Sequence, residues 1–343
     1  MKTKLAFSYS HSLGIYSIFP GRGFNHPIDL TIDDGGTVYV LDRGGSDTPV
    51  RCNYKRVSKL TVDEEHRGTF VIGGVVEGAM MWPAALVVGP DGNLYISDEA
   101  QHSVHIFSVD GAFLGAWGRK GSGEGQFDRP SGIAFDPEGN LVVADALNGR
   151  LQRYTRDGRY LAGWAGPGTE DGRLSMPWGV AVDRDGNVYV ADWGNDRIQK
   201  FDAGGGHLAT FGSPGHGDGQ FTRPSSVDID QEGNIYVADW GNERVQVLAP
   251  DGEFLAKFRG DSSLSRWAQD YFISNQNELE ERLKADMAPD VDFPDDDDLP
   301  RHQSAAVEKY FWGPASARVD SQGRVYVTET CRHRVQVYRR SDA

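Results

Sequence analysis

Arginine stands directly before a proline in two stretches of the chain that resemble each other, at Arg129 and Arg223. A guanidinium group offers a planar fork of donors that suits the two oxygens of a carboxylate or phosphate. Met176 precedes the matching proline of a third stretch. We therefore expect these three residues to contact a ligand, with ion pairs to the chain's own acidic residues as the alternative role of the arginines.

Four tryptophans occupy related positions in the same stretches. Trp193 and Trp240 each follow an aspartate, Trp178 follows one of the prolines, and Trp82 precedes another. An indole ring buries a large area and its N–H can bond to a partner, so tryptophan is enriched at binding surfaces. Trp178, Trp193 and Trp240 are predicted to form an aromatic wall, with packing between structural units as the alternative. Trp82 is expected to contact a ligand at the channel mouth.

His26 and Asp29 are the candidates for proton transfer. His26 precedes the first of the prolines, and Asp29 is the second residue after it. A carboxylate or imidazole at such a position could act as a general base, whereas a hydrogen-bonded structural aspartate is the alternative for Asp29. The other residues at the second position after a proline are small and leave room in a channel: Ala85, Gly132, Gly179, Ser226 and Ser316.

These candidates owe their positions to an internal repeat. Each unit opens with a proline, and the middle four prolines are evenly spaced, whereas the first and last intervals are wider and contain insertions. Self-similarity at a fixed period indicates a repeat architecture. The six opening residues are Pro27, Pro83, Pro130, Pro177, Pro224 and Pro314.

Within a unit, apolar runs of about five residues alternate with glycine-centred turns, which is typical of strands and hairpins. The Asp-x-x-Gly-Asn turn at Asp136 to Asn140 supplies residues that tolerate the positive φ of a tight hairpin, and it recurs from Asp183 and from Asp230. Each unit therefore predicts four antiparallel strands. Such sheets bury both faces only by packing around an axis, so the sequence predicts an all-β, six-bladed β-propeller.

The segments VVADALNGRLQ, YVADWGNDRIQ and YVADWGNERVQ resemble the NHL repeat family, and the likeness extends over nearly the whole chain. The aspartate of this motif recurs in five units, and repetition favours a structural role in holding loops over catalysis. His102 and His333 stand at the family's own histidine position, which explains them without a metal. The recurring aspartates are Asp42, Asp98, Asp145, Asp192 and Asp239.

The architecture is also similar to that of two enzyme groups. Peptidylglycine amidating lyases hold zinc through histidines of different blades, but of the nine histidines here only His26 falls at a mouth position. The sequence therefore predicts no zinc site. Regucalcin-like lactonases hold a divalent metal through carboxylate and amide ligands, of which Asp29 alone has a counterpart, so a divalent metal in the central channel stays open.

After Pro314 only three strands fit before the C-terminus, so the last blade lacks its outer strand. The N-terminal segment aligns with a fourth strand and should supply it, which removes two exposed sheet edges. We expect residues 1–343 to form one domain closed in this way.

The wide interval before Pro314 contains an acidic insert, 261–309. Trp267, Tyr271, Leu279 and Leu283 mark an amphipathic helix, which we expect to break near Ser274 and Asn275. The aspartate-rich stretch from Asp290 should be an irregular loop. The insert lies on the face that carries the mouth residues, so it is either a cover over the channel mouth or a decoration at the blade edge.

Composition narrows the class of partner. A formal net charge of −15 argues against nucleic acid, because binding to phosphates needs lysine and arginine. No signal peptide or membrane-spanning stretch is apparent, so a cytoplasmic protein is expected. Cys52 and Cys331 form no metal-binding pattern, and their pairing stays open.

Two functions fit these observations. The first is a small-molecule or peptide site at the channel mouth under the insert, for binding alone or for a lyase or hydrolase reaction. The alternative is a non-catalytic protein-interaction scaffold. A deep polar pocket would favour the first and a broad flat surface the second.

Overall fold

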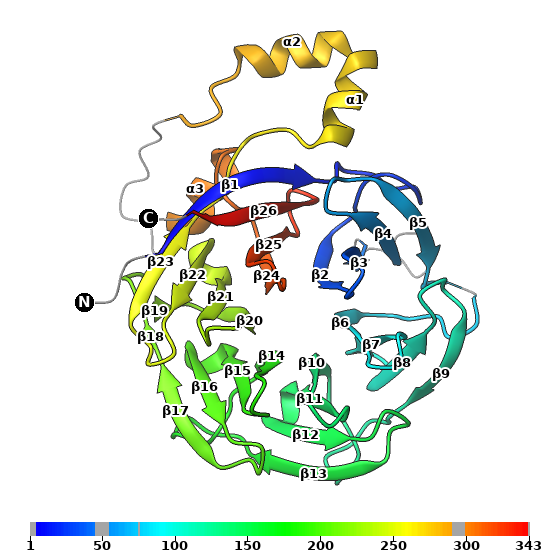
Figure 1. Cartoon of the computed structure of the whole chain (residues 1–343), viewed down its shortest axis with the longest axis vertical. Coiled ribbons are helices and arrows are strands. Elements are labelled where there is room, and N and C mark those ends of the chain that lie inside the picture. The colour runs from blue at the N-terminus through cyan, green and yellow to red at the C-terminus, as the bar shows by residue number, and fades with distance from the viewer. Residues whose placement is uncertain (1–4, 45–54, 75, 290–298, 342–343) are drawn as a thin grey trace.

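A computed structural model describes residues 5–44, 55–74, 76–289 and 299–341. Six four-stranded antiparallel sheets stand around a central axis (Figure 1). Each sheet runs from an inner strand at the axis to an outer strand at the rim. The predicted all-β, six-bladed β-propeller is confirmed.

The strands follow the repeat units. Blade 1 contains β2 (Pro27–Ile32), β3 (Thr37–Asp42), β4 (Arg56–Thr61) and β5 (His66–Val71). Blade 2 contains β6 (Pro83–Val88), β7 (Leu94–Asp98), β8 (Ser103–Phe107) and β9 (Phe113–Trp117). Blade 3 contains β10 (Pro130–Phe135), β11 (Leu141–Asp145), β12 (Arg150–Tyr154) and β13 (Tyr160–Ala165). Blade 4 contains β14 (Pro177–Val182), β15 (Val188–Asp192), β16 (Arg197–Phe201) and β17 (His207–Phe211).

Blade 5 contains β20 (Pro224–Ile229), β21 (Ile235–Asp239), β22 (Arg244–Leu248) and β23 (Phe254–Phe258). Blade 6 contains β24 (Pro314–Val319), β25 (Arg324–Glu329), β26 (Arg334–Ser341) and, from the other end of the chain, β1 (Ala6–Leu13). Two short strands, β18 (Ser213–Pro214) and β19 (Gln220–Phe221), pair within a loop. The 3-10 helices are η2 (Ala146–Asn148), η3 (Trp193–Asn195) and η4 (Trp240–Asn242).

The two chain ends close the ring as predicted. Strand β1 pairs antiparallel with β26, and the register runs from Ala6 opposite Ser341 to Leu13 opposite Val335. Leu13 is fully buried in a cluster that includes Val335 and Trp267. Ring closure therefore joins the termini through both backbone pairing and a shared apolar core.

The repeated aspartates hold loops, which supports the structural role that their repetition suggested. The carboxylate of Asp145 accepts hydrogen bonds from the N–H of Asp128 (2.6 Å) and from the side chains of Asn148, Arg150 and Gln152 (2.8, 2.8 and 3.1 Å). Arg150 in turn donates to carbonyls of the loop that leads into its own blade. Corresponding contacts recur at Asp192, Asp239 and Glu329.

A second repeated device joins neighbouring blades. In blades 2, 4, 5 and 6, the residue just before the third strand has a positive φ. Its side chain accepts a hydrogen bond from the backbone N–H of the residue that precedes the opening proline of the next blade. His102 and His333 are two of these acceptors, so their imidazoles serve the repeat. The pairs are His102 with Arg129, Asp196 with Arg223, Glu243 with Gly313, and His333 with His26.

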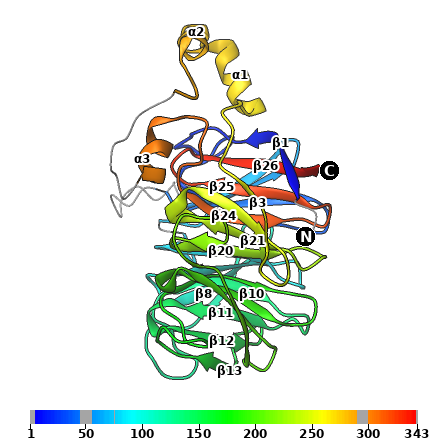
Figure 2. The same ribbon diagram turned by 90° about the vertical axis from the view of Figure 1, so that its left-hand side faces the viewer.

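The described part of the insert contains three helices. α1 (Arg266–Ser274) and α2 (Gln276–Lys284) are separated at Asn275, so the predicted break is confirmed, and α3 (Leu299–Ala306) was not predicted. α1 and α2 extend beyond the edge of the ring, whereas α3 lies against one of its faces (Figures 1 and 2). The predicted loop at 290–298 falls outside the described residues.

The start of α1 is fixed to blade 1 by a buried carboxylate. Glu64 accepts hydrogen bonds from the N–H of Trp267 (2.8 Å) and from the N–H of Gly14 (2.5 Å). An anion at a helix N-terminus also interacts favourably with the helix dipole. This contact explains why α1 stays at the edge near the closure instead of crossing the channel.

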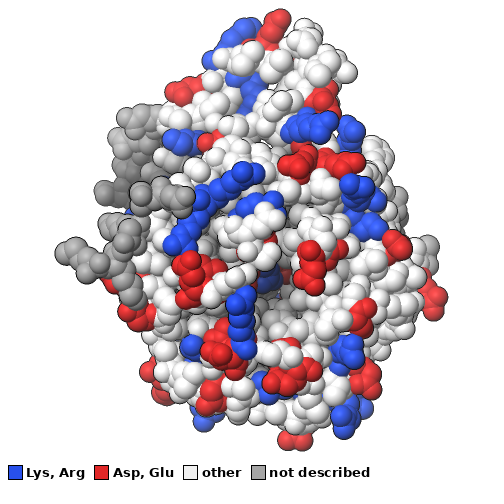
Figure 3. Space-filling view, in the orientation of Figure 1, with Lys and Arg blue, Asp and Glu red and all other residues white. Residues whose placement is uncertain are grey.

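Charges of both signs are mixed on the face of the molecule that Figure 3 presents. Lysine and arginine side chains stand beside aspartate and glutamate around a central hollow. Among the described residues, no helix is long and apolar enough to cross a membrane.

Candidate functional site

A large cavity lies at the mouth of the ring, with a volume of about 1070 Å³. Its wall comes from blades 1, 2, 4, 5 and 6 and from α3 of the insert. The apolar part includes Ile28, Met80 and Met81, and the charged part includes Arg43 and Arg301. Such a space is large enough to enclose a drug-sized molecule.

Five tryptophans give the cavity its chemical character. They reach it from blades 2, 4, 5 and 6, and an arginine lies over the ring of four of them at 4.7 to 5.7 Å from the ring centre. Cation–π attraction of this kind holds both partners in place. The five are Trp82, Trp178, Trp193, Trp240 and Trp312.

The structure brings five of the predicted site residues to this wall: His26, Trp82, Trp178, Trp193 and Trp240. The two predicted arginines are exposed and do not line the cavity, but each lies over a tryptophan ring of its wall. The guanidinium of Arg129 lies 5.6 Å from the ring centre of Trp82, and that of Arg223 lies 5.0 Å from that of Trp193.

Met176 does not belong with them. It lines a separate pocket of about 220 Å³ beside Leu147 and Leu174. Blade 3 contributes no residue to the wall of the large cavity among the described residues.

Asp29 is held in an ion pair at the interface between blades. Both of its oxygens accept from Arg318, at 3.0 and 2.8 Å, and one also accepts from the N–H of Leu86. It is 3% exposed and is not part of the cavity wall. These contacts favour the structural alternative for Asp29 over a general base.

Two of the small residues after the prolines also have a packing reason. A Cβ on Gly132 would stand 2.3 Å from the carbonyl oxygen of Trp178, and one on Gly179 would stand 2.6 Å from Cα of Ser226. The backbones of neighbouring inner strands thus touch at these positions.

Glu243 is a site residue that the sequence did not single out. Its carboxyl lines the cavity yet is 1% exposed, and it accepts a hydrogen bond from the N–H of Gly313 at 2.6 Å. Burial raises the pKa of Glu243 to about 8, against a smaller opposing effect of that hydrogen bond and of Arg301. A carboxylate at the repeat's position of positive φ is a signal that could have identified it.

His26 meets a second imidazole at the cavity edge. The rings of His26 and His333 stand edge to face with 4.7 Å between their centres. Burial lowers the pKa of His333 to about 4, so this ring is neutral near pH 7. Nδ1 of His26 lies 2.7 Å from Oδ1 of Asn25 and donates to it.

Arg301 is the contribution of the insert to the site, and it too was missed. Its guanidinium lies over the ring of Trp240, 4.7 Å from the centre. α1 and α2 lie beyond the ring's edge (Figure 1), which favours the alternative of a decoration for this part of the insert. Within the part of 261–309 that the structure describes, only Arg301 lines the cavity.

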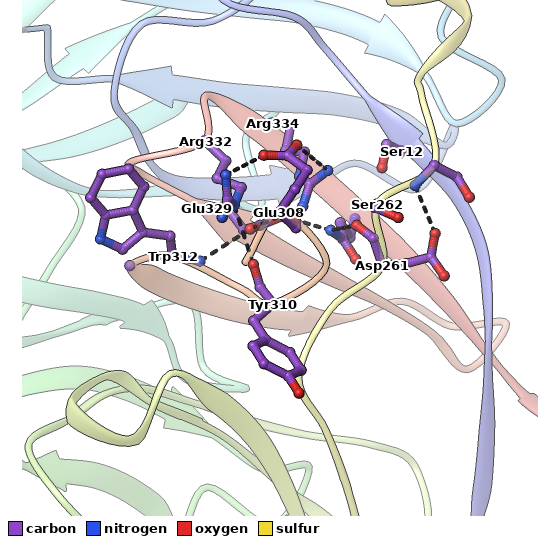
Figure 4. A network of polar contacts seen from close by, with 12 residues as sticks. Ser12, Asp261, Ser262, Glu308, Tyr310, Trp312, Glu329, Arg332 and Arg334 are labelled. Carbon is purple, nitrogen blue, oxygen red and sulfur yellow. Dashed lines mark hydrogen bonds and ion pairs between the residues drawn. The ribbon is translucent and has the colours of Figure 1, made fainter. Parts of the chain in front are cut away.

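A polar network fixes α3 to blade 6. Arg332 pairs with Glu308 and donates to the carbonyls of Ser304 and Val307 at 2.7 and 2.9 Å, near the C-terminal end of α3. Figure 4 shows Arg332 between Glu308 and Tyr310, with Arg334 and Glu329 beside them. An arginine at this end of a helix satisfies carbonyls that have no partner inside it.

In the described ranges, no group of three or more histidine, cysteine, aspartate or glutamate side chains is placed to hold a metal ion. Cys331 lines the cavity as a free thiol, whose pKa is raised by burial. Cys52 lies outside the described residues, so its pairing stays open.

The fold and the repeated contacts define the class of the protein as a six-bladed β-propeller with NHL repeats. Four segments match the sequence model of the NHL repeat, namely residues 127–154, 174–201, 221–248 and 311–338. They fall in blades 3 to 6, each ending with the third strand of its blade. No curated protein matches the chain in sequence.

Solved structures with a similar fold are distant in sequence. A catalytically inactive variant of virginiamycin B lyase from Staphylococcus aureus with quinupristin has a TM-score of 0.57 at 12% identity, over 97% of this chain and 99% of that one. An auxiliary nutrient binding protein from Bacteroides thetaiotaomicron has a TM-score of 0.63 at 11% identity, over 99% and 78%. A nidogen/laminin complex gives 0.53 at 16% identity, over 75% and 93%. At these identities the likeness is one of fold.

Proposed function

We propose that the mouth cavity binds a small organic molecule whose rings stack on the tryptophans. The observation that carries this proposal is the convergence of five indole rings on one space of about 1070 Å³. Indole faces offer a large apolar area, and a concave site with a few polar groups is the usual form of a small-molecule site. The pairing of arginines with these rings holds the wall ready before a ligand arrives.

A lyase or hydrolase reaction in the same cavity is the catalytic form of this proposal. Two groups of the wall could transfer a proton. Glu243 keeps its proton near neutral pH because burial raises its pKa to about 8, as a general acid requires. His26 brings an imidazole to the wall, the side chain that most often acts as a general base. One solved propeller with a similar fold is virginiamycin B lyase, which supports the reaction class only as an analogy of fold.

The test uses aromatic probes and matched tryptophan variants. Binding of 1-naphthoate, 1-naphthyl phosphate and 1-naphthalenemethanol is followed by quenching of tryptophan fluorescence. We expect Trp178→Phe and Trp240→Phe to weaken the binding of whichever probes bind. Trp164→Phe, on the outer strand β13, should leave the affinity unchanged. If no probe binds, or if all three variants behave alike, the proposal is wrong.

The alternative function is a protein-interaction scaffold, and one observation favours it. Ile273 and Leu283 on α1 and α2 are 69% and 76% exposed, on the pair of helices that extends beyond the ring. Apolar side chains on a projecting element suit contact with another protein. In that case an Ile273→Ser, Leu283→Ser double variant would lose the partner, while the affinity for the probes would not change.

A further inference from the structure

The charged groups around the mouth cavity determine the sign of its ligand. We propose that the cavity takes an organic anion, a carboxylate or phosphate ester on a ring-bearing molecule, and that Arg301 of the insert is its main anion contact. This inference rests on the proposed function and adds the chemical class of the ligand and the residue that selects it.

The cavity is cationic in a strongly acidic protein. Arg43, Lys55 and Arg301 line it, whereas Glu243 is the one acidic side chain of the wall among the described residues. The whole chain has a formal net charge of −15. A local excess of cations inside a concave, partly apolar space attracts anions more strongly than the same charges on an open surface.

Glu243 does not oppose this charge. Its side chain is 1% exposed, and burial raises its pKa to about 8, so near pH 7 it is mostly neutral. One of its oxygens accepts from the N–H of Gly313. A protonated carboxyl adds no repulsion toward an anion.

Arg301 is better placed than Arg43 to receive the anion. Arg43 forms an ion pair with the buried Glu99 at 3.3 Å, so its charge is already matched. Arg301 lies over the face of Trp240. The N–H groups of a guanidinium point outward in the plane of the group, so its edge can donate to two oxygens of an anion. A ring of the same ligand can then pack on a neighbouring indole.

The position of Arg301 is set before the ligand binds. α3 is held at its other end by Arg332, which donates to the carbonyls of Ser304 and Val307 and pairs with Glu308 (Figure 4). Because these contacts are made within the protein, the ordering of α3 does not have to be supplied by the ligand. The insert thus acts as a support for one arginine.

The experiment compares the three naphthalene probes on the full chain. At low salt we expect 1-naphthoate or 1-naphthyl phosphate to bind roughly tenfold to a hundredfold more tightly than neutral 1-naphthalenemethanol, the range for a hydrogen bond to a charged group. The stronger of the two anions identifies the carboxylate or the phosphate. Arg301→Gln should remove most of this preference, weakening the binding of the anions much more than the binding of the neutral probe.

Two further variants make the outcome decisive. Arg301→Lys keeps the charge without the planar fork and should retain only part of the preference, while Arg159→Gln, on the exposed β12–β13 turn, should retain all of it. Thermal melts establish that each variant folds. Equal binding of charged and neutral probes would overturn the inference while leaving ligand binding intact, as would an anion preference that survives Arg301→Gln. Failure of every probe to bind would instead remove the proposed function itself.

Discussion

Replacing Leu13 by alanine tests whether the joined termini hold the ring together. Leu13 is the last residue of β1, stands opposite Val335 of β26, and is fully buried. Its cluster includes Phe24 and Leu30 of the first blade and its entry loop, together with Trp267 of α1. The cluster that contains Leu13 therefore joins the first blade, the last blade and the insert.

The expected loss follows from its burial. A buried Leu→Ala change costs about 3 kcal/mol, made up of the lost transfer free energy and the cavity left behind. The entropy of unfolding is about 2.1 cal/mol/K per residue. For 343 residues this is about 0.7 kcal/mol/K, so the melting temperature should fall by about 4 °C.

Thermal melts and urea titrations measure this loss, with Leu114→Ala as the matched control. Leu114 lies on the outer strand β9 and is 53% exposed, so its truncation should change the unfolding free energy by less than about 0.5 kcal/mol. A double variant with Val335→Ala should be non-additive by about 0.5 kcal/mol or more, because the two side chains share one cluster. A Leu13→Ala loss no larger than that of Leu114→Ala, or strict additivity, would refute the role of this strand pairing in stability.

Two further variants test the site and the insert. The pKa of Glu243 is raised from 4.5 to about 8, so the stability contributed by its protonated form is full below about pH 4.5 and is lost as the pH rises through 8. Glu243→Gln keeps an acceptor for the Gly313 N–H and should melt higher relative to wild type at pH 9 than at pH 5, whereas an equal offset at both pH values would contradict the raised pKa. Arg332→Asn should release α3 and speed tryptic cleavage after Arg301, and an unchanged cleavage rate would show that α3 is held by other contacts.

The architecture could be predicted because the same strand and turn pattern recurs in successive units of the sequence. Each Asp-x-x-Gly-Asn turn fixes a hairpin, and each Asp, Asn, Arg and Gln of the motif makes the same set of bonds, as at Asp145 and Arg150. The missing fourth strand of the last blade left the N-terminus as its source. The hairpins and the motif contacts follow from local sequence patterns, and the ring closure follows from counting strands. Neither prediction requires knowledge of which blades face each other.

The residues of the site could be predicted only where they occupy equivalent positions of the repeat. Tryptophans at repeat positions were found on the cavity wall, but Met176 faces another pocket and Asp29 is paired with Arg318 from the last blade. Which side of the ring a residue faces depends on the side chains of all six blades together. The role of Arg301 could not be predicted, because this residue lies in the insert, outside the repeat units, and has no equivalent in the other blades.

Blade 6 shows how one change in the repeat can attach a new element. In blades 3 to 5 the motif's asparagine donates to a carbonyl of the preceding loop, as Asn148 does to Gly121 at 2.9 Å. An asparagine has a short reach and suits a loop that returns directly to its blade. The same position in blade 6 is Arg332, whose longer side chain reaches the carbonyls of Ser304 and Val307 in and beside a helix. The residue that anchors an ordinary loop has thus become the anchor of α3, and through α3 it places Arg301 in the cavity.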